Sequence, residues 1–319
     1  MASRHSPLTL SRQAQMVDLI DRLAPSEGYT LSMLDGVHLM RSNHPLARTP
    51  ALYEPCIVIV AQGRKRGFHD GETYVYDALH YLVLAVPLPF EIETEASPQE
   101  PMLGIALRID PTALTELALA ADEVQPHPEV RPRTLLATPI DERIADATVR
   151  LLEALTHPGD AKLLGPGIVR EITYRVLMGE QGGGLRAAML QGGHFGRIAK
   201  ALRRIHAHYD RQLDVATLAR EANMSAPAFH AHFKAVTATS PIQYIKAMRL
   251  HQARLQMIRH GITAAAAAAQ VGYESTSQFS REFKRMFGRS PLDEARHLKD
   301  VLKLAAPVRL ATVEPRALV

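Results

Sequence analysis

Apolar residues near the N-terminus have the spacing of a helix. Val17, Ile20 and Leu23 recur every three residues and would form one stripe, which Ala24-Pro25 ends. The sequence therefore predicts an N-terminal helix within residues 1–26.

Between residues 29 and 109 the pattern changes to short apolar or alternating runs, at 57–61, 68–76, 81–86, 90–95 and 102–109. Asp70-Gly71 within the second run is a two-residue hairpin signal. In the last run, alternate residues from Leu103 to Ile109 point to one side. Several short strands at this spacing predict a small antiparallel barrel or sandwich.

Helical spacing returns after Pro111, with helices expected near 111–119, 139–157 and 166–180. Runs of glycine at 182–184 and 192–193 mark a boundary. We therefore expect an N-terminal helix (1–26), a strand-rich domain (27–110), a helical connector (111–184), a glycine-rich linker (185–194), a C-terminal helical domain (195–304) and a tail (305–319).

A segment of the C-terminal domain occurs twice. The stretch from Met224 to Pro241 recurs without a gap from Glu274 to Pro291, which aligns the pairs Ser225/Ser275, Phe229/Phe279, Phe233/Phe283, Lys234/Lys284 and Ser240/Ser290. Each copy predicts a helix with a serine N-cap, and Ser275 with Gln278 is typical of a capping box. A short helix and a tight turn precede each copy. The segments 214–236 and 263–287 therefore predict two helix-turn-helix units.

Length and composition are those of a globular protein of about two domains: 319 residues, 46% hydrophobic and 22% charged. No stretch resembles a transmembrane span or a secretory signal, and a single cysteine, Cys56, suits the reducing cytoplasm. The net charge of +4 is unevenly distributed. Residues 194–304 contain 18 Lys and Arg against 8 Asp and Glu, whereas residues 1–193 are net acidic. A basic segment that coincides with two helix-turn-helix units indicates a DNA-binding domain.

These motifs closely resemble the AraC/XylS family of bacterial transcription regulators. The residues that carry the likeness are Leu218-Ala219, Met224-Ser225, Phe229, Phe233-Lys234, Ser240-Pro241, Tyr244, Arg249-Leu250 and Ala253-Arg254, followed by Val271-Gly272-Tyr273, Ser277 to Arg281, Phe283-Lys284, Phe287-Gly288 and Ser290-Pro291. The N-terminal part, with Gln62-Gly63-Arg64-Lys65 and Tyr76-Asp77, resembles the cupin-like sensing domain of one branch of that family. The implied fold class is α+β: a cupin-like antiparallel β-barrel with a helical connector, then an all-α domain with two helix-turn-helix units.

The resemblance implies that the early exposed positions of each second helix contact base edges. Here the exposed candidates are Pro227, His230, Ala231 and Lys234 in the first unit, and Ser277, Gln278, Ser280, Arg281 and Lys284 in the second. Arg281 is the strongest candidate, because its guanidinium can bind a guanine edge through two hydrogen bonds. The alternative is that Arg281 contacts only phosphate or pairs with Glu282 or Glu274. Lys234 and Lys284 lie toward the helix ends, where phosphate contact or simple solvation is expected. The helix at 241–259 is expected to hold the two units so that they enter successive major grooves.

A small-molecule effector is the family expectation for the N-terminal domain. The candidate lining residues are Tyr74, Tyr76, His80 and Arg108; alternatively, the tyrosines are ordinary barrel residues and Arg108 is a surface charge. Cys56 is either an inert buried residue or a thiol sensor of electrophiles, activated if folding brings Arg64 or Lys65 near it. The histidines of this domain are scattered, so we expect no metal site, cofactor or catalysis.

We therefore interpret the chain as a cytoplasmic, sequence-specific DNA-binding regulator, in a family with more activators than repressors, controlled by a small-molecule signal. The expected partners are double-stranded promoter DNA, an unidentified effector and RNA polymerase. The helices at 139–157 and 166–180 either form a homodimer or only cover the barrel. Two alternatives remain: a cupin metalloenzyme fused to a DNA-binding module, and a DNA-binding protein that needs no ligand.

Overall fold

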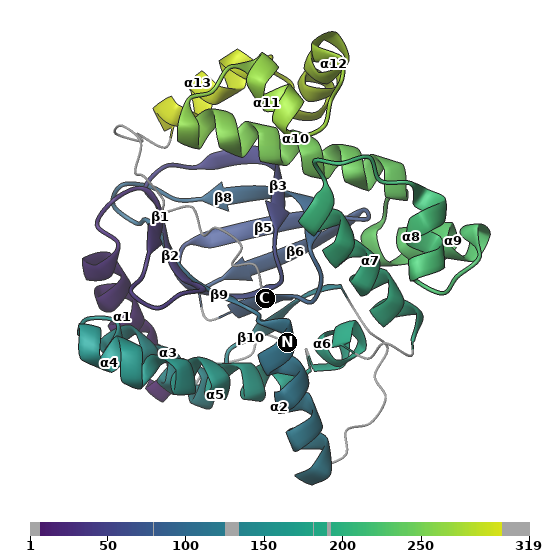
Figure 1. Ribbon diagram of the computed structural model, residues 1–319. Helices are drawn as coiled ribbons and strands as arrows, with labels where there is room; N and C mark the ends of the chain where they lie inside the picture. Colours follow the sequence, from purple (N-terminus) through teal and green to yellow (C-terminus); the bar gives the residue numbers. More distant parts are fainter. Residues whose placement is uncertain (1–6, 79, 125–133, 181, 190–192, 302–319) are drawn as a thin grey trace. The chain divides into compact units, whose positions relative to one another are not determined.

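The computed structural model describes residues 7–78, 80–124, 134–180, 182–189 and 193–301 (Figure 1). The predicted tail, 305–319, lies outside these residues. The chain forms two compact units, Met1–Arg249 and Leu250–Val319. Their boundary falls within helix α10 (Pro241–His260), so it does not follow the domain boundaries expected from the sequence, which remain a prediction.

Helix α1 (Pro7–Leu23) of the first unit confirms the predicted helix, and ten strands follow among the residues of this unit that the structure describes. The strands are β1 (Gly28–Leu31), β2 (Val37–Ser42), β3 (Leu46–Tyr53), β4 (Cys56–Gln62), β5 (Arg64–His69), β6 (Glu72–Asp77), β7 (His80–Leu84), β8 (Leu88–Glu95), β9 (Met102–Arg108) and β10 (Leu135–Pro139). All pair antiparallel. One sheet has the order β1-β2-β9-β4-β7-β10 and the other β3-β8-β5-β6.

The described strands form two open sheets and not the closed barrel that we expected. Alternation of apolar and polar residues predicts strands and their faces, but closure depends on which edges hydrogen-bond. The hairpin prediction is confirmed: β5 and β6 are joined by Asp70 and Gly71, with φ of 51° and 77°. Both values lie in the left-handed region, as a type I′ turn requires.

Two hydrophobic cores lie on opposite faces of the six-stranded sheet. Leu103, Ile105 and Leu107 of β9 share one face, as predicted, and pack with the helices in the larger core. The other core lies between the two sheets and includes Val58, Tyr76, Leu82, Phe90 and Met102. The region between the sheets is therefore the protected interior of the N-terminal domain.

The helices of the connector are α2 (Pro111–Val124), α3 (Glu142–Ala154), α4 (Pro158–Leu163), α5 (Gly165–Met178) and α6 (Gly182–Met189). Strand β10, which pairs with β7, was not predicted from the sequence. Helix α6 occupies much of the predicted glycine-rich linker. Because Leu185 and Ala188 are buried, their packing outweighs the helix cost of about 1 kcal/mol for each glycine.

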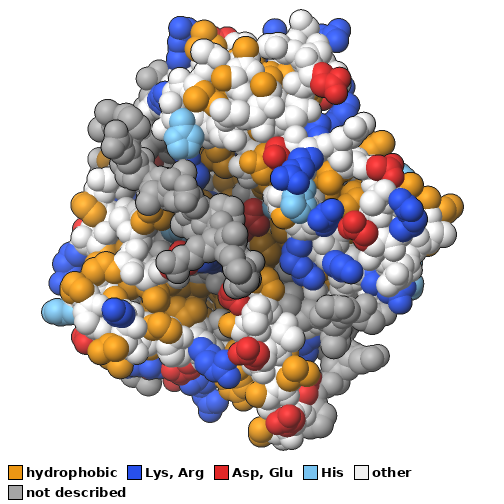
Figure 2. Space-filling view, viewed as in Figure 1, with side chains coloured by type: hydrophobic (Ala, Val, Ile, Leu, Met, Phe, Trp, Pro, Cys, Tyr) orange, Lys and Arg blue, Asp and Glu red, His pale blue; other side chains and the backbone are white. Residues whose placement is uncertain are grey.

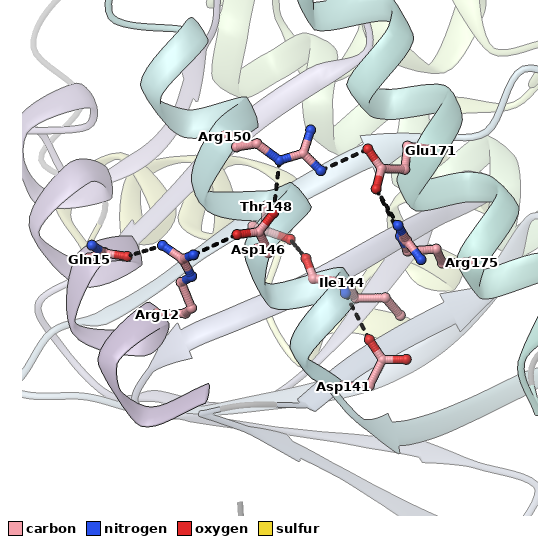
Figure 3. Close-up of polar contacts among 9 residues, drawn as sticks. All are labelled: Arg12, Gln15, Asp141, Ile144, Asp146, Thr148, Arg150, Glu171 and Arg175. Atoms are coloured by element: carbon pink, nitrogen blue, oxygen red, sulfur yellow. Dashed lines mark hydrogen bonds and ion pairs between the residues drawn. The ribbon is translucent and has the colours of Figure 1, made fainter. Parts of the chain in front are cut away.

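An ion-pair network joins α1, α3 and α5, as Figure 3 shows. Asp146 of α3 pairs with Arg12 of α1 at 2.7 Å and with Arg150 at 2.9 Å. Glu171 of α5 then pairs with Arg150 at 2.8 Å and with Arg175 at 2.5 Å. The hydrogen bond from Arg150 is the main reason why the pKa of the Glu171 carboxyl is lowered. These bonds fix the three helices side by side.

Helix α3 has no spare apolar face. Its apolar residues, including Ile144, Leu151 and Leu152, are buried, whereas Glu142, Arg143 and Glu153 are exposed. This favours the interpretation that the helix covers the sheet. Dimerisation remains a prediction.

The remaining helices belong to the predicted DNA-binding region. They are α7 (His194–His208), α8 (Val215–Glu221), α9 (Ala226–Thr237), α10, α11 (Ala264–Gln270), α12 (Thr276–Phe287) and α13 (Pro291–Val301). In the second unit, a buried ion pair of 3.3 Å between Arg254 and Glu294 ties α10 to α13. The Arg254 guanidinium also lies 4.3 Å from the Phe287 ring centroid. No helix of the described residues is long and apolar enough to span a bilayer.

Candidate nucleic-acid interface and interior polar cluster

The two repeats form helix-turn-helix units that are closed by the same local interactions. Ser225 caps α9 by accepting a hydrogen bond from the Ala228 amide, and Ser275 caps α12 through the Gln278 amide. The Gln278 side chain does not return to Ser275, as a full capping box requires, but donates to Glu282 at 3.3 Å. Only the serine half of the predicted capping box is therefore formed.

The turns differ by one residue. In the first unit Asn223 adopts φ 52°, and in the second Gly272 adopts φ 80°. The amide after each of them donates to a carbonyl five residues earlier, from Met224 to Ala219 and from Tyr273 to Ala268. These are Schellman-type endings with a left-handed residue. Because Glu274 is inserted before the serine cap, the gapless repeat holds from the cap onward and not through the turn.

The phenylalanines fix which face of each second helix is exposed. Phe229 and Phe233 of α9, and Phe279 and Phe283 of α12, are 0% exposed. Eight of the predicted DNA contacts are consequently exposed: Pro227, His230, Ala231 and Lys234 on α9, and Ser277, Gln278, Arg281 and Lys284 on α12; Ser280 is half-buried. The helical spacing therefore brings each set to one face of its own helix.

Arg281 has no ion pair within the described residues, which removes one of its alternative roles there. The carboxylate of Glu282 instead accepts a hydrogen bond of 2.7 Å from the Tyr273 hydroxyl. Its other oxygen accepts from Gln278. A planar guanidinium thus stays exposed on α12, with all of its donors available for a guanine edge or a phosphate.

A basic group on α7 was not predicted from the sequence. Lys200 and Arg204 are exposed and Arg203 is half-buried, and Arg220 of α8 is exposed as well. Lys and Arg side chains gather over α7 and α8 in Figure 2. The helical spacing of residues 200, 203 and 204 was the signal that could have revealed this group. Such a face would attract the phosphate backbone of DNA.

The four predicted effector residues do not form one site. Tyr74 and Tyr76 belong to the core between the sheets. Tyr76 is 0% exposed, and the partly buried Tyr74 packs against this core. His80 pairs with Asp77 at 2.7 Å. The exposed Arg108 pairs with Asp35. In the strand register, Arg108 lies opposite Cys56 and His80 lies opposite Val60. Arg108 and His80 are therefore near opposite ends of β4.

A buried lysine accompanies the tyrosines instead. Lys65 of β5 is 4% exposed, and its Nζ donates to the Tyr53 hydroxyl at 3.2 Å. Tyr76 lies opposite Lys65 in the β5–β6 ladder. Its hydroxyl has no hydrogen-bond partner among the described residues. From the sequence, Lys65 was expected to matter only if folding brought it near Cys56.

Cys56 does lie near Lys65, as the sensor hypothesis required, but burial dominates its chemistry. Burial and then the charge of Glu54 raise the pKa of the Cys56 thiol to about 12, and the opposing effect of Lys65 is smaller. The thiol is therefore protonated at neutral pH, which weighs against reaction as a thiolate. The sensor role stays an untested prediction.

The comparisons with known proteins agree with this architecture. Residues 33–184 match the family described as AraC-type transcriptional regulator N-terminus, and residues 218–297 match a helix-turn-helix domain family. The chain belongs to the AraC family of transcription regulators, which is a family of DNA-binding regulators and not of enzymes.

Individual relatives match in part. A putative AraC-like transcription regulator of Streptomyces lividans is 36% identical over 100 residues, which is 31% of this chain and 33% of the relative. The chain thus matches about a third of the length of its curated relatives. Two structures of ToxT from Vibrio cholerae share the fold. Apo ToxT K231A has a TM-score of 0.57 and 12% identity, covering 85% of this chain and 98% of ToxT. ToxT bound to an unsaturated fatty acid has a TM-score of 0.56 and 13% identity, covering 82% and 93%.

Proposed function

We propose that this protein binds promoter DNA through α9 and α12 and that a small molecule bound by the N-terminal domain controls this binding. The observation that carries the proposal is the repeated unit in which buried phenylalanines leave the opposite face of each second helix exposed. On α12 that face holds Arg281 and Lys284. A helix with such a face is the element that major-groove readers of this class insert.

The two helices would contribute differently. Pro227 and Ala231 of α9 have no side-chain donor, and His230 is a modest one, so α9 would read shape and thymine methyl groups. Arg281 and Gln278 of α12 can bond base edges directly. The second unit would then supply most of the sequence selectivity, whereas Lys200 and Arg204 of α7 would hold phosphates.

The small-molecule part rests on two observations. ToxT, whose fold is similar, is described with an unsaturated fatty acid bound. In this chain, the region between the two sheets contains a buried lysine and a buried, unpartnered hydroxyl, Lys65 and Tyr76. Buried polar groups that lack partners are unfavourable unless something binds them. A regulator of this kind acts in the bacterial cytoplasm, with RNA polymerase as its further partner.

Two matched substitutions test the DNA contacts. Arg281→Ala should relax the base preference at one position by about 1–3 kcal/mol in the full-length protein. Lys284→Ala should weaken binding to all sequences alike and lower the slope of log K against log[salt] by roughly one unit. Selection from random duplexes, followed by titrations at several salt concentrations, measures both. An unchanged base preference in Arg281→Ala would contradict the assigned role.

Control by a ligand is tested separately. Extracts of small molecules, fractionated and added to the full-length protein, should contain a compound that raises its melting temperature and changes its promoter affinity. If no fraction changes either quantity, the protein is the ligand-independent DNA-binding protein of the alternative hypothesis.

A further inference from the structure

The side chain of Gln278 on α12 is held by a carboxylate of the same helix. Its Nε2 donates a hydrogen bond of 3.3 Å to Oε1 of Glu282, one turn further along. The other oxygen of Glu282, Oε2, accepts a hydrogen bond of 2.7 Å from the Tyr273 hydroxyl. Tyr273 lies in the turn before α12, so the carboxylate is bonded from two directions.

The phenol that bonds Glu282 is itself fixed in place. The Tyr273 ring meets the buried Phe279 ring edge-on, with 5.4 Å between the ring centroids. The Tyr273 amide donates to the carbonyl of Ala268 at the end of α11. Tyr273 and Glu282 are both half-buried. The packing of the helix-turn-helix unit therefore positions the carboxylate, which distinguishes it from an ordinary contact between two exposed side chains one turn apart.

The carboxylate determines which way the amide group of Gln278 faces. A glutamate is ionised at neutral pH and then only accepts hydrogen bonds. It therefore bonds the amino group of the amide and repels the carbonyl oxygen. Because one N–H of Gln278 is used in this way, the exposed side chain presents its second N–H and its Oε1 to a partner.

One donor beside one acceptor matches the edge of adenine. In the major groove adenine offers a donor, the N6 amino group, and an acceptor, N7. Guanine offers two acceptors, O6 and N7. An amide held with its oxygen outward would place lone pairs against O6 of guanine, so the orientation of Gln278 favours adenine and disfavours guanine.

Gln278 and Arg281 are neighbours on the exposed face of α12. Side chains three residues apart on a helix have Cβ atoms about 5–6 Å apart. Successive bases of a strand are about 3.4 Å apart along the DNA axis. The base that Gln278 contacts should therefore lie next to the guanine assigned to Arg281.

The first helix-turn-helix unit lacks this arrangement. In the gapless repeat, Ala228 of α9 takes the place of Gln278, and His232 takes the place of Glu282. Alanine has no amide to orient, and the His232 ring stacks on the His194 ring at 3.8 Å between centroids. The preference for adenine should accordingly belong to the second unit alone.

We propose that Gln278 reads an adenine and that Glu282 and Tyr273 are positioning residues that give it this preference. The inference rests on the proposed binding of DNA by α12. It adds one base to the sequence that this helix selects, beside the guanine of Arg281.

The test is selection of duplexes from a random pool by the full-length protein. The selected duplex and a copy in which the adenine is replaced by guanine are then titrated. The wild type should prefer the adenine duplex roughly tenfold, within the range of a contact through two hydrogen bonds. Gln278→Ala should lose this preference, which identifies the position, and should keep the preference for the neighbouring guanine.

Glu282→Gln is nearly isosteric and tests the positioning role. Its neutral amide no longer excludes the carbonyl oxygen of Gln278, so the ratio of affinities for the adenine and guanine duplexes should fall toward one. The ratio is the readout, because removal of a negative charge also strengthens binding to every duplex. Tyr273→Phe keeps the ring on Phe279 and should lower the ratio in the same direction.

Glu274→Gln is the matched control. It removes the same charge from an exposed residue just before the helix, so it should strengthen binding to both duplexes alike and leave their ratio unchanged. Thermal melting of each variant confirms that it is folded.

The possible results separate the two proposals. If Gln278→Ala selects the same bases as the wild type at every position, Gln278 reads no base, and DNA binding by α12 still stands. If Glu282→Gln keeps the full preference for adenine, the positioning role is wrong. Enrichment of guanine at the Gln278 position would also overturn the inference, and failure to enrich any duplex would overturn the proposed DNA binding as well.

Discussion

The Tyr244 hydroxyl donates a hydrogen bond of 2.9 Å to the carbonyl of Pro87. Tyr244 belongs to α10 and Pro87 lies between strands β7 and β8, so this bond joins the helical region to the strands within the first unit. Nε2 of His206 lies 2.8 Å from the same hydroxyl, and Nδ1 of His206 lies 3.0 Å from Glu54. A continuous chain of polar contacts therefore runs from α10 through α7 to the loop before β4.

Tyr244→Phe should destabilise the protein by about 1–3 kcal/mol, because Tyr244 is 0% exposed and the Pro87 carbonyl would lose its partner. Urea unfolding measures the difference. Tyr174→Phe on α5, at a side chain that is 41% exposed, is the control and should stay within about 0.5 kcal/mol of the wild type. Equal unfolding curves for the two variants would show that the Tyr244 hydroxyl contributes nothing.

The left-handed residue in the first helix-turn-helix gives a second prediction. Asn223 has φ 52°, and its carbonyl accepts from Arg197 at 3.1 Å. Asn223→Ala should cost about 1–2 kcal/mol, since alanine is disfavoured in this region, whereas Asn223→Gly should be close to neutral. Thermal unfolding of the pair compares them directly. A glycine variant as unstable as the alanine variant would mean that the turn does not need this conformation.

Alkaline pH gives a third prediction. Because burial raises the pKa of Cys56 to about 12, the folded state holds this proton more tightly than the unfolded state. Stability from this group is present below the thiol pKa of the unfolded chain, about 8.5, and is lost as pH rises toward 12. Between pH 8 and pH 10 the free energy of unfolding of the wild type should fall by about 2 kcal/mol more than that of Cys56→Ala. The free energy of unfolding by urea at both pH values measures this. If the free energy of unfolding fell equally in the wild type and in Cys56→Ala, the thiol would not be held protonated by the folded state.

The sequence predicted those features that local chemistry determines. Serine caps at Ser225 and Ser275, paired phenylalanines and the Asp70-Gly71 turn each depend on residues close together in the chain, and all appear in the structure. The glycines before Leu185 predicted a linker over residues 185–194, whereas residues 182–189 form helix α6, in which Leu185 is buried.

Features that depend on distant pairing could not be predicted. The two open sheets, and the pairing of β10 with β7, follow from which strand edges meet, and no local pattern encodes that. The interior polar cluster shows the same limit. Tyr74 and Tyr76 were placed correctly on one strand face, whereas the hydrogen bond between Lys65 of β5 and Tyr53 of β3 depends on how their strands pack.

The central claim is that two helix-turn-helix units of this chain bind DNA together. The most direct measurement is nuclease protection, at low salt, by the full-length protein of a duplex that it has selected from random sequences. We predict two separate protected elements, of which one weakens in His230→Ala and the other in Arg281→Ala. Absence of any protected element, or loss of both elements together in each variant, would contradict the account.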